Sequence, residues 1–316
     1  MKKGQYYMIE INGLVKLFGK KAAVDGISFT VGEGEIVGFL GPNGAGKSTT
    51  MNILTGYLSS TEGSAKVNGI DILENPMEAK KLLGFLPEQP PLYPDMTVDE
   101  YLGFVYELRG CRLPREAHLA EICKVTRIVD VRSRVIGNLS KGYRQRVGIA
   151  QALIGNPPVI IFDEPTVGLD PKQIIEIRNL IRNLGKNHTV ILSTHILSEV
   201  QAVCDRVIII KDGRIVADEK TENITKTVED SRRYTVKISG PQKEVLKLLK
   251  DINGIAKAEA TGERELDSCT FIIESEKGVD PRKPLFYAMA NAGFPIIGIE
   301  TASAALEDVF ISLTSK

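Results

Sequence analysis

A glycine-rich stretch at residues 41–49 has the residue types and spacing of a phosphate-binding loop. Its glycines let the backbone turn and bring N–H groups up to phosphate oxygens, where a Cβ atom would intrude. The lysine can reach the β- and γ-phosphates of a nucleotide, and the serine hydroxyl can ligate Mg²⁺. A helix predicted over Ser48–Leu54 directs its positive dipole end at the anion. The predicted nucleotide-binding residues are Gly41, Pro42, Asn43, Gly44, Ala45, Gly46, Lys47, Ser48 and Thr49.

Two adjacent carboxylates, Asp163 and Glu164, follow the apolar run Val159–Phe162. In open α/β sheets, ligands bind outside the carboxyl ends of the strands, which is where these side chains fall. Successive residues of an extended strand point in opposite directions, so the two carboxylates have different roles. We expect Asp163 to hold Mg²⁺ through water and Glu164 to act as general base on the attacking water. A solvated acidic turn is the alternative interpretation.

His195 closes a second apolar strand, Val190–Ser193, in the same way. From the end of that strand its imidazole can reach the γ-phosphate or the water that attacks it. We therefore group His195 with Glu164 and Lys47 as predicted catalytic residues. A lone histidine is more often structural, so this interpretation depends on the neighbouring motifs.

Residues 139–146 place a candidate helix N-cap, Ser140, before a group of cations. Lys141, Arg144 and Arg146 occupy the first two turns, where positive charge opposes the helix dipole. An anion at this helix start would remove the conflict. Our hypothesis is that the Ser140 hydroxyl and the Gly142 N–H cap the γ-phosphate of a second nucleotide site. The alternative is a surface helix with solvated cations.

These residues require a scaffold of strands and helices. Up to about residue 213, β-branched runs alternate with helical patterns, which indicates a largely parallel α/β sheet. The candidate strands are Met8–Ile11, Ile27–Val31, Glu35–Leu40, Lys66–Val67, Val159–Phe162, Thr189–Ser193 and Val207–Lys211. Residues 94–156 instead carry helical patterns, over Thr97–Leu108, Arg115–Val129 and Lys141–Ile154, which predict an all-helical insertion.

The sequence becomes polar and loses its periodicity from about Asp218, which predicts a linker at 221–233 between domains at 1–220 and 234–316. In the second domain the order strand, helix, strand, strand, helix, strand predicts a small α+β ferredoxin-like sandwich. A last helix is expected over Ala304–Thr314. The predicted strands are Tyr234–Ser239, Gly254–Ala260, Cys269–Glu274 and Pro295–Thr301, and the other helices are Pro241–Asp251 and Pro281–Asn291. We see no catalytic constellation in this domain.

The composition is that of an ordinary globular protein. The 316 residues, 43% hydrophobic and 25% charged, suit two domains. Lys+Arg and Asp+Glu both number 40, so nothing in the charge balance indicates nucleic acid as a partner. The four cysteines lack paired ligand spacing and are expected to be reduced thiols. The start shows no apolar signal segment, and no apolar run approaches the roughly 20 residues that cross a bilayer. Any membrane role therefore requires a partner.

Over Met8–Ala217 the chain resembles the nucleotide-binding subunit of an ATP-binding cassette transporter, with five motifs in family order and spacing. The resemblance implies a P-loop cassette domain that binds ATP and Mg²⁺ and pairs head to tail with a second copy or a paralogous cassette. Each ATP is then sandwiched between one phosphate loop and the partner's signature, which corresponds to Leu139–Gln145. It also implies Asp170 as part of the D-loop, His195 as the switch histidine and Phe18 as the adenine-stacking aromatic. Core packing is the alternative for Phe18.

Two positions depart from the family pattern. The usual signature Leu-Ser-Gly-Gly-Gln reads Leu-Ser-Lys-Gly-Tyr at residues 139–143, which keeps the serine and the second glycine. Where most relatives carry a glutamine that lines the Mg²⁺ site, alignment on Leu92-Tyr93-Pro94 gives Glu88, with Gln89 next to it. A carboxylate there can hold water near Mg²⁺. We choose Glu88 for this role, with Gln89 as the alternative.

The Leu86-Pro-Glu88 triplet and the tail at 306–314 resemble the export branch typified by drug, sodium, gliding and copper-related systems. In that branch a multi-span permease is a separate chain, so the resemblance implies an exporter motor held at the cytoplasmic face of the membrane. One rival is a soluble cassette ATPase of DNA repair, chromosome structure or translation. Those relatives carry coiled-coil insertions, zinc ligands or two cassettes, and none is visible here. The other rival is a regulatory module that senses ATP without turnover.

Overall fold

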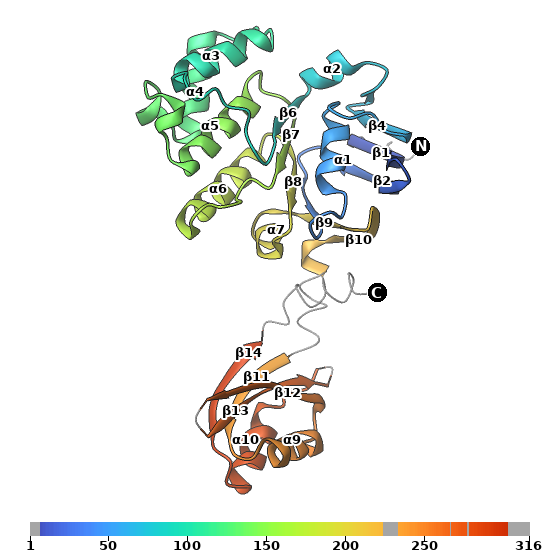
Figure 1. Cartoon of the computed structure of the whole chain (residues 1–316), viewed down its shortest axis with the longest axis vertical. Coiled ribbons are helices and arrows are strands. Elements are labelled where there is room, and N and C mark those ends of the chain that lie inside the picture. Colours follow the sequence, from blue (N-terminus) through green and yellow to red (C-terminus); the bar gives the residue numbers. More distant parts are fainter. Residues whose placement is uncertain (1–6, 224–232, 266, 277, 303–316) are drawn as a thin grey trace. The chain divides into compact units, whose positions relative to one another are not determined.

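The computed structural model describes residues 7–223, 233–265, 267–276 and 278–302. Contacts divide the chain after Thr221 into two compact units, and each is described by itself. Among the described residues, no helix has both the length and the apolar character needed to cross a membrane. Figure 1 shows the elements of both units.

A six-stranded sheet forms the centre of the first unit. In spatial order its strands are β10 (Arg214–Lys220), β9 (Arg206–Lys211), β3 (Ile36–Leu40), β8 (Thr189–Thr194), β7 (Val159–Asp163) and β6 (Leu83–Leu86). All neighbours are parallel except β9 and β10, which pair antiparallel. Every residue of β3, β7 and β8 is buried, as their unbroken apolar runs predict for strands covered on both faces. Their carboxyl ends therefore lie at one edge of the sheet.

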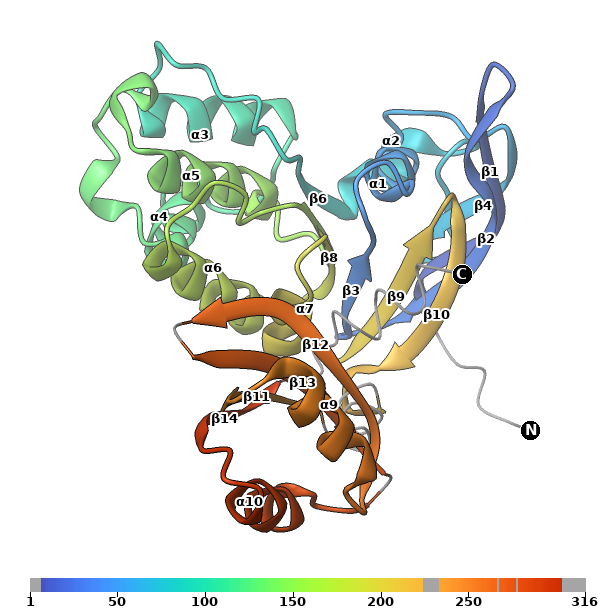
Figure 2. The same cartoon turned by 60° about the horizontal axis from the view of Figure 1, so that its bottom comes forward.

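A second, antiparallel sheet corrects the expectation that the first unit contains one largely parallel sheet. Its order is β2 (Lys21–Gly32), β1 (Tyr7–Phe18), β4 (Glu62–Val67) and β5 (Ile70–Asp71). Only two residues, Gly19 and Lys20, join β1 to β2, and so short a turn can connect antiparallel strands but not parallel ones. Both strands are also longer than the expected Met8–Ile11 and Ile27–Val31. Figure 2 shows β2 beside β10, with which it is in contact.

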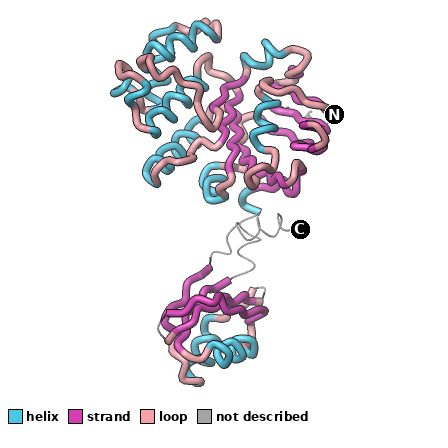
Figure 3. The backbone as a smooth tube through the Cα atoms, viewed as in Figure 1, coloured by secondary structure: helices cyan, strands magenta, loops and turns pink. Residues whose placement is uncertain are grey.

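The helices of the first unit are α1 (Lys47–Leu54), α2 (Pro76–Lys81), α3 (Val98–Leu108), α4 (Arg115–Thr126), α5 (Lys141–Leu153), α6 (Pro171–Leu184) and α7 (Leu197–Val203), with short 3₁₀ turns at Val129–Val131 and Ile136–Asn138. Residues 94–156 contain helices and one isolated β-bridge, and Figure 3 shows this helical subdomain apart from the strands. Helix α4 ends at Thr126, three residues before the expected end, because Arg127 adopts the left-handed conformation that terminates helices.

The second unit contains one sheet with two helices. Its elements are β11 (Arg233–Ser239), α9 (Gln242–Asp251), β12 (Ile255–Glu265), β13 (Ser268–Ser275), α10 (Arg282–Asn291) and β14 (Ile296–Ala302). The antiparallel order β12-β13-β11-β14 is the one a ferredoxin-like βαββαβ chain forms. Its core includes Val236 and Phe271 of the sheet and Leu249 and Leu285 of the helices. The helix expected over 304–314 lies outside the described residues. Strand β10 ends at Lys220, directly before the expected linker at 221–233, and β11 begins at Arg233, the last residue of that linker.

Candidate nucleotide site

The loop between β3 and α1 has no room for a side chain at two glycine positions. A Cβ atom at Gly41 would lie 2.5 Å from the carbonyl oxygen of Ile210. Gly46 has a φ of 109°, and a Cβ there would lie 2.5 Å from the carbonyl oxygen of Ala23. The strand that precedes the loop is buried, and α1 follows directly at Lys47. The sequence therefore fixes a tight turn that aims the start of a helix at an open space.

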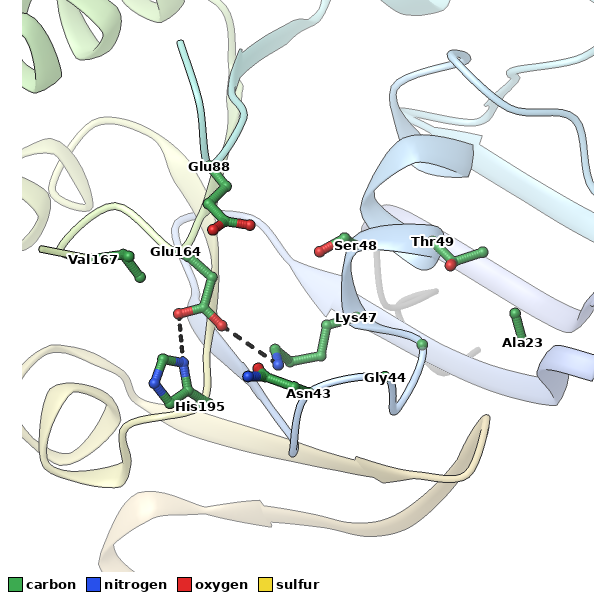
Figure 4. A pocket seen from close by; sticks show the side chains of 11 residues that line it. Ala23, Asn43, Gly44, Lys47, Ser48, Thr49, Glu88, Glu164, Val167 and His195 are labelled. Atoms are coloured by element: carbon green, nitrogen blue, oxygen red, sulfur yellow. Dashed lines mark hydrogen bonds and ion pairs between the residues drawn. The ribbon is translucent and has the colours of Figure 1, made fainter.

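That space is a pocket of about 380 Å³, shown in Figure 4. Its lining comes from the loop and α1, from the ends of β7 and β8, and from the segment after β6. The lining residues are Ala23, Asn43, Gly44, Gly46, Lys47, Ser48, Thr49, Glu88, Glu164, Val167 and His195. Nine of them were predicted from the sequence as nucleotide, metal or catalytic residues. Ala23 and Val167 were not, because neither side chain carries a chemical signal that the sequence would reveal.

Lys47, Glu164 and His195 form a connected polar group at the inner wall of this pocket (Figure 4). The Lys47 ammonium donates to the carbonyl oxygen of Gly41 at 2.8 Å and lies 3.4 Å from Glu164 Oε1. The other carboxylate oxygen of Glu164 lies 2.8 Å from His195 Nδ1. Lys47 and Glu164 are both buried, so their opposite charges compensate each other where water cannot. The structure thus joins the three residues that the sequence proposed as catalytic.

Glu164 adopts a left-handed backbone conformation, with a φ of 50°. Its N–H donates to the carbonyl oxygen of Ser193 at 2.9 Å, and its own carbonyl accepts from Val167 at 3.3 Å. The first bond continues the β7–β8 pairing one residue past its end. Because the backbone turns at Glu164, the side chains of Asp163 and Glu164 lie in different surroundings.

Asp163 is not one of the residues that line the pocket. The side chain is buried, and its Oδ1 atom has no hydrogen-bond partner. Burial raises the pKa of Asp163 above its usual value, and the hydroxyls of Ser193 and Ser48 partly oppose that shift. A buried carboxylate oxygen without a partner is suited to a cation or its water shell.

The donor set fits Mg²⁺ only together with phosphate. Among the described residues, no three His, Cys, Asp or Glu side chains form a group that could hold a metal ion. Mg²⁺ commonly takes one or two carboxylates, several waters and the oxygens of a bound phosphate, so it does not need such a group. Ser48 and Glu88 line the pocket, and Asp163, which has an unpartnered carboxylate oxygen, interacts with Ser48.

Glu88 and the adjacent Gln89 face different pockets. Glu88 lines the pocket of Lys47 and Ser48. Gln89 lines a separate cavity of about 610 Å³ that includes Asn52 and Arg109. The structure therefore places the carboxylate, and not the amide, beside the phosphate loop.

Phe18 lies at the tip of the β1–β2 hairpin and is 53% exposed. The Lys16 ammonium lies 5.4 Å from the centre of its ring. Phe18 does not line the pocket of about 380 Å³. Its exposed ring is not packed in the core, which was the alternative interpretation.

Ser140, Gly142 and Asp170 lie together at the neighbouring starts of α5 and α6, and none of them lines the pocket. Ser140 caps α5 by accepting from the N–H of Tyr143 at 3.4 Å, and Asp170 caps α6 by accepting from that of Gln173 at 2.9 Å. A Cβ atom on Gly142 would lie 2.7 Å from the Gln173 side chain, so glycine allows the two helix starts to approach closely.

Two of the three cations at the start of α5 have local partners. Arg146 pairs with Glu176 and donates to the carbonyl oxygen of Thr126 at 3.0 Å. Arg144 donates to the carbonyl oxygen of Leu139 at 2.7 Å. The conflict between these charges and the helix dipole is therefore smaller than the sequence suggests.

Comparison with known proteins agrees with the fold and the phosphate loop. Residues 24–167 match a protein family described as ABC transporter. The bacitracin transport ATP-binding protein BcrA of Bacillus licheniformis is 30% identical over 308 residues, which cover 97% of each chain. YxlF of Bacillus subtilis (strain 168), an uncharacterised ABC transporter ATP-binding protein, is 39% identical over 209 residues, 66% of this chain and 69% of YxlF. The solved dimeric cassette MJ0796, in a post-hydrolysis state with ADP and phosphate, is 29% identical with a TM-score of 0.62, and the match covers 68% of this chain and 99% of that one.

These findings confirm the cassette fold, the binding of ATP and the ATPase activity that the sequence predicted. The phosphate loop at residues 41–49 lies within the matched region. The chain belongs to the ABC transporter family, as an ATP-binding subunit that hydrolyses ATP.

Proposed function

We propose that this chain is the ATPase motor of an exporter whose membrane-spanning part is a separate permease chain. The group formed by Lys47, Glu164 and His195 in the phosphate pocket is the observation on which the motor role depends. The export role is supported by BcrA, a bacitracin transport protein that matches nearly the whole chain, second unit included. In this proposal the chain acts at the cytoplasmic face of the membrane, bound to its permease and not to nucleic acid.

The chemistry follows from where the pocket places charge. Lys47 balances the negative charge that grows on the phosphoryl oxygens during transfer, and the backbone N–H groups of the loop add fixed dipoles. Glu164 accepts the proton of the attacking water, while His195 holds the carboxylate from the other side. Mg²⁺, when bound, neutralises phosphate charge, and Ser48, Asp163 and Glu88 are the residues that would hold it or its waters. Phe18 supplies a ring for the adenine base.

We further propose that the site is completed by a second cassette, either another copy or a paralogue, paired head to tail. Ser140, Gly142 and Asp170 lie at two adjoining helix starts on the same unit, away from the pocket. Helix N-termini favour anions, so this surface suits the γ-phosphate of an ATP held by the partner. Closure of the pair on ATP and its opening after hydrolysis would then drive the permease between two conformations.

An arginine at position 140 tests the pairing. In a Glu164→Gln background, which retains ATP, we expect the cassette to form ATP-dependent dimers in size-exclusion chromatography with light scattering. Adding Ser140→Arg places a bulky side chain where the γ-phosphate approaches, and we expect the dimers to disappear. Ser133→Arg is the matched control, because Ser133 is an exposed serine of the same helical subdomain. Undiminished dimers in the Ser140→Arg variant would rule out this surface as the second half of the site.

The permease is tested by affinity purification of the tagged chain from detergent extracts of its native cells, followed by mass spectrometry. We expect a multi-span membrane protein that lacks a cassette of its own, and we expect its yield to stay constant after nuclease treatment. Recovery of the chain only with ribosomes or DNA would overturn the exporter role in favour of a soluble cassette ATPase.

A further inference from the structure

Glu199, a residue of α7 outside the pocket, carries a carboxylate that is almost fully enclosed. It is 1% exposed. Its Oε2 atom accepts a hydrogen bond from the Thr194 hydroxyl at 2.8 Å, and its Oε1 atom accepts one from the Thr166 hydroxyl. One buried side chain therefore joins the turn after β7 to the last residue of β8.

The two threonines stand next to the proposed catalytic residues. Thr194 directly precedes His195, and Thr166 lies two residues after Glu164. The Thr194 hydroxyl also accepts from the N–H of Ile196 at 3.1 Å, so it fixes the backbone on both sides of His195. The carbonyl oxygen of Thr166 accepts from the N–H of Leu169 at 3.1 Å, which orders the turn that begins at Glu164.

His195 needs such support more than Glu164 does. The His195 side chain is 42% exposed, whereas that of Glu164 is 7% exposed. Backbone pairing between β7 and β8 ends at Asp163 and Ser193, and one further backbone bond, from Glu164 to Ser193, extends it. Beyond that point side chains connect the two segments, through the Glu164–His195 bond and the bridge through Glu199.

Arg178 of α6 supplies the countercharge for this bridge. Its Nη2 atom lies 3.9 Å from Glu199 Oε1 and 3.4 Å from the Ser198 hydroxyl. An ionised carboxylate is an acceptor at both oxygens, which matches the two hydroxyl donors. A buried charge persists only when it is paired and hydrogen-bonded, and Glu199 meets both conditions.

We propose that Glu199 is a positioning residue for ATP hydrolysis. Through Thr166 and Thr194 it sets the separation of the two segments, and so holds Glu164 and His195 at the distance at which their side chains bond. This inference rests on the catalytic roles proposed for those two residues. Displacing a catalytic group by about 1 Å can lower a rate about 10²-fold, so a bridge of this kind acts on kcat and not on ATP binding.

The test compares Glu199→Ala and Glu199→Gln in two backgrounds, the otherwise unchanged chain and His195→Ala. Single-turnover hydrolysis with excess protein keeps slow variants measurable. We expect Glu199→Ala to lower kcat about 10–100-fold with ATP affinity within about twofold, and Glu199→Gln to recover part of the loss by serving one threonine. In the His195→Ala background the same substitutions should change the rate less than about threefold, because the pair they position is already broken.

Two further variants make the result interpretable. Thr194→Val removes the hydrogen bond between Thr194 and Glu199 but keeps the buried carboxylate. It therefore tests the bridge even if Glu199→Ala fails to fold. Glu35→Gln is the matched control, because Glu35 is a partly buried carboxylate that pairs with Arg206 at 2.7 Å far from the pocket. It should lower the melting temperature without lowering kcat.

An equal loss of rate in both backgrounds would overturn the positioning role, as would a change in KM alone or an unchanged kcat in Glu199→Ala and Thr194→Val. These outcomes can be distinguished from a result showing that Glu164 is not the general base. A Glu164→Gln variant that keeps its turnover refutes the role of Glu164, whereas equal losses refute only the role of Glu199.

Discussion

The Glu164→Gln variant is expected to bind ATP with nearly unchanged affinity and to hydrolyse it about 10²–10⁴-fold more slowly. A general base contributes a factor of this size, and the amide cannot accept the proton of the attacking water. The substitution keeps the shape of the side chain, and the Gln carbonyl oxygen can still accept a hydrogen bond from His195 or Lys47. Loss of turnover without loss of binding is therefore the signature of this role.

The measurement is steady-state phosphate release together with equilibrium binding of a fluorescent ATP analogue. Glu78→Gln is the control, because Glu78 forms an exposed ion pair with Lys81 at 2.7 Å and has no contact with the pocket. It should leave both quantities unchanged. A Glu164→Gln variant within tenfold of the normal rate would show that another group activates the water.

Replacing Lys47 with alanine is expected to lower ATP affinity about 10–100-fold, since each hydrogen bond to a charged group contributes about 1.5–3 kcal/mol. The turnover of the residual complex should also fall at least about 10²-fold, because the lost charge acts most strongly on the transition state. A third effect follows from the structure itself. Glu164 is buried beside the Lys47 ammonium at 3.4 Å, so the variant should also have a lower free energy of unfolding when no nucleotide is bound.

Isothermal titration with ATP, phosphate release and urea unfolding measure these three effects separately. Lys81→Ala removes an exposed lysine that only pairs with Glu78, and it should change none of them by more than a few tenths of a kcal/mol. Lys47→Ala with normal ATP affinity would mean that the loop N–H groups alone bind the phosphates.

The pocket was largely predictable from sequence because its chemistry depends on local spacing. The glycines at 41 and 46 and the lysine at 47 lie close together in one short stretch of sequence, and their roles follow from its backbone geometry. Asp163 and His195 were found because each ends an apolar run, and buried parallel strands bring their ends to one edge.

The remaining features depend on contacts between distant segments, which a single sequence does not display. The two-residue turn after Phe18 could be predicted from the neighbouring residues, but the pairing of β1 with β4 could not. The sequence shows that the charges of Arg144 and Arg146 oppose the helix dipole, but it does not show that they pair with Leu139 and Glu176 in the folded chain. The bridge through Glu199 likewise joins this residue to side chains that lie 33 and five residues earlier in the chain.

The backbone of Glu164 shows where function and stability make opposite demands. A residue other than glycine held in a left-handed conformation costs about 1–3 kcal/mol unless its surroundings compensate. Glycine would relieve that strain, and asparagine would tolerate the conformation better, but neither carries a carboxylate. If position 164 were randomised, selection for heat resistance alone would thus favour variants that cannot hydrolyse ATP. Selection for turnover would instead retain the strained glutamate.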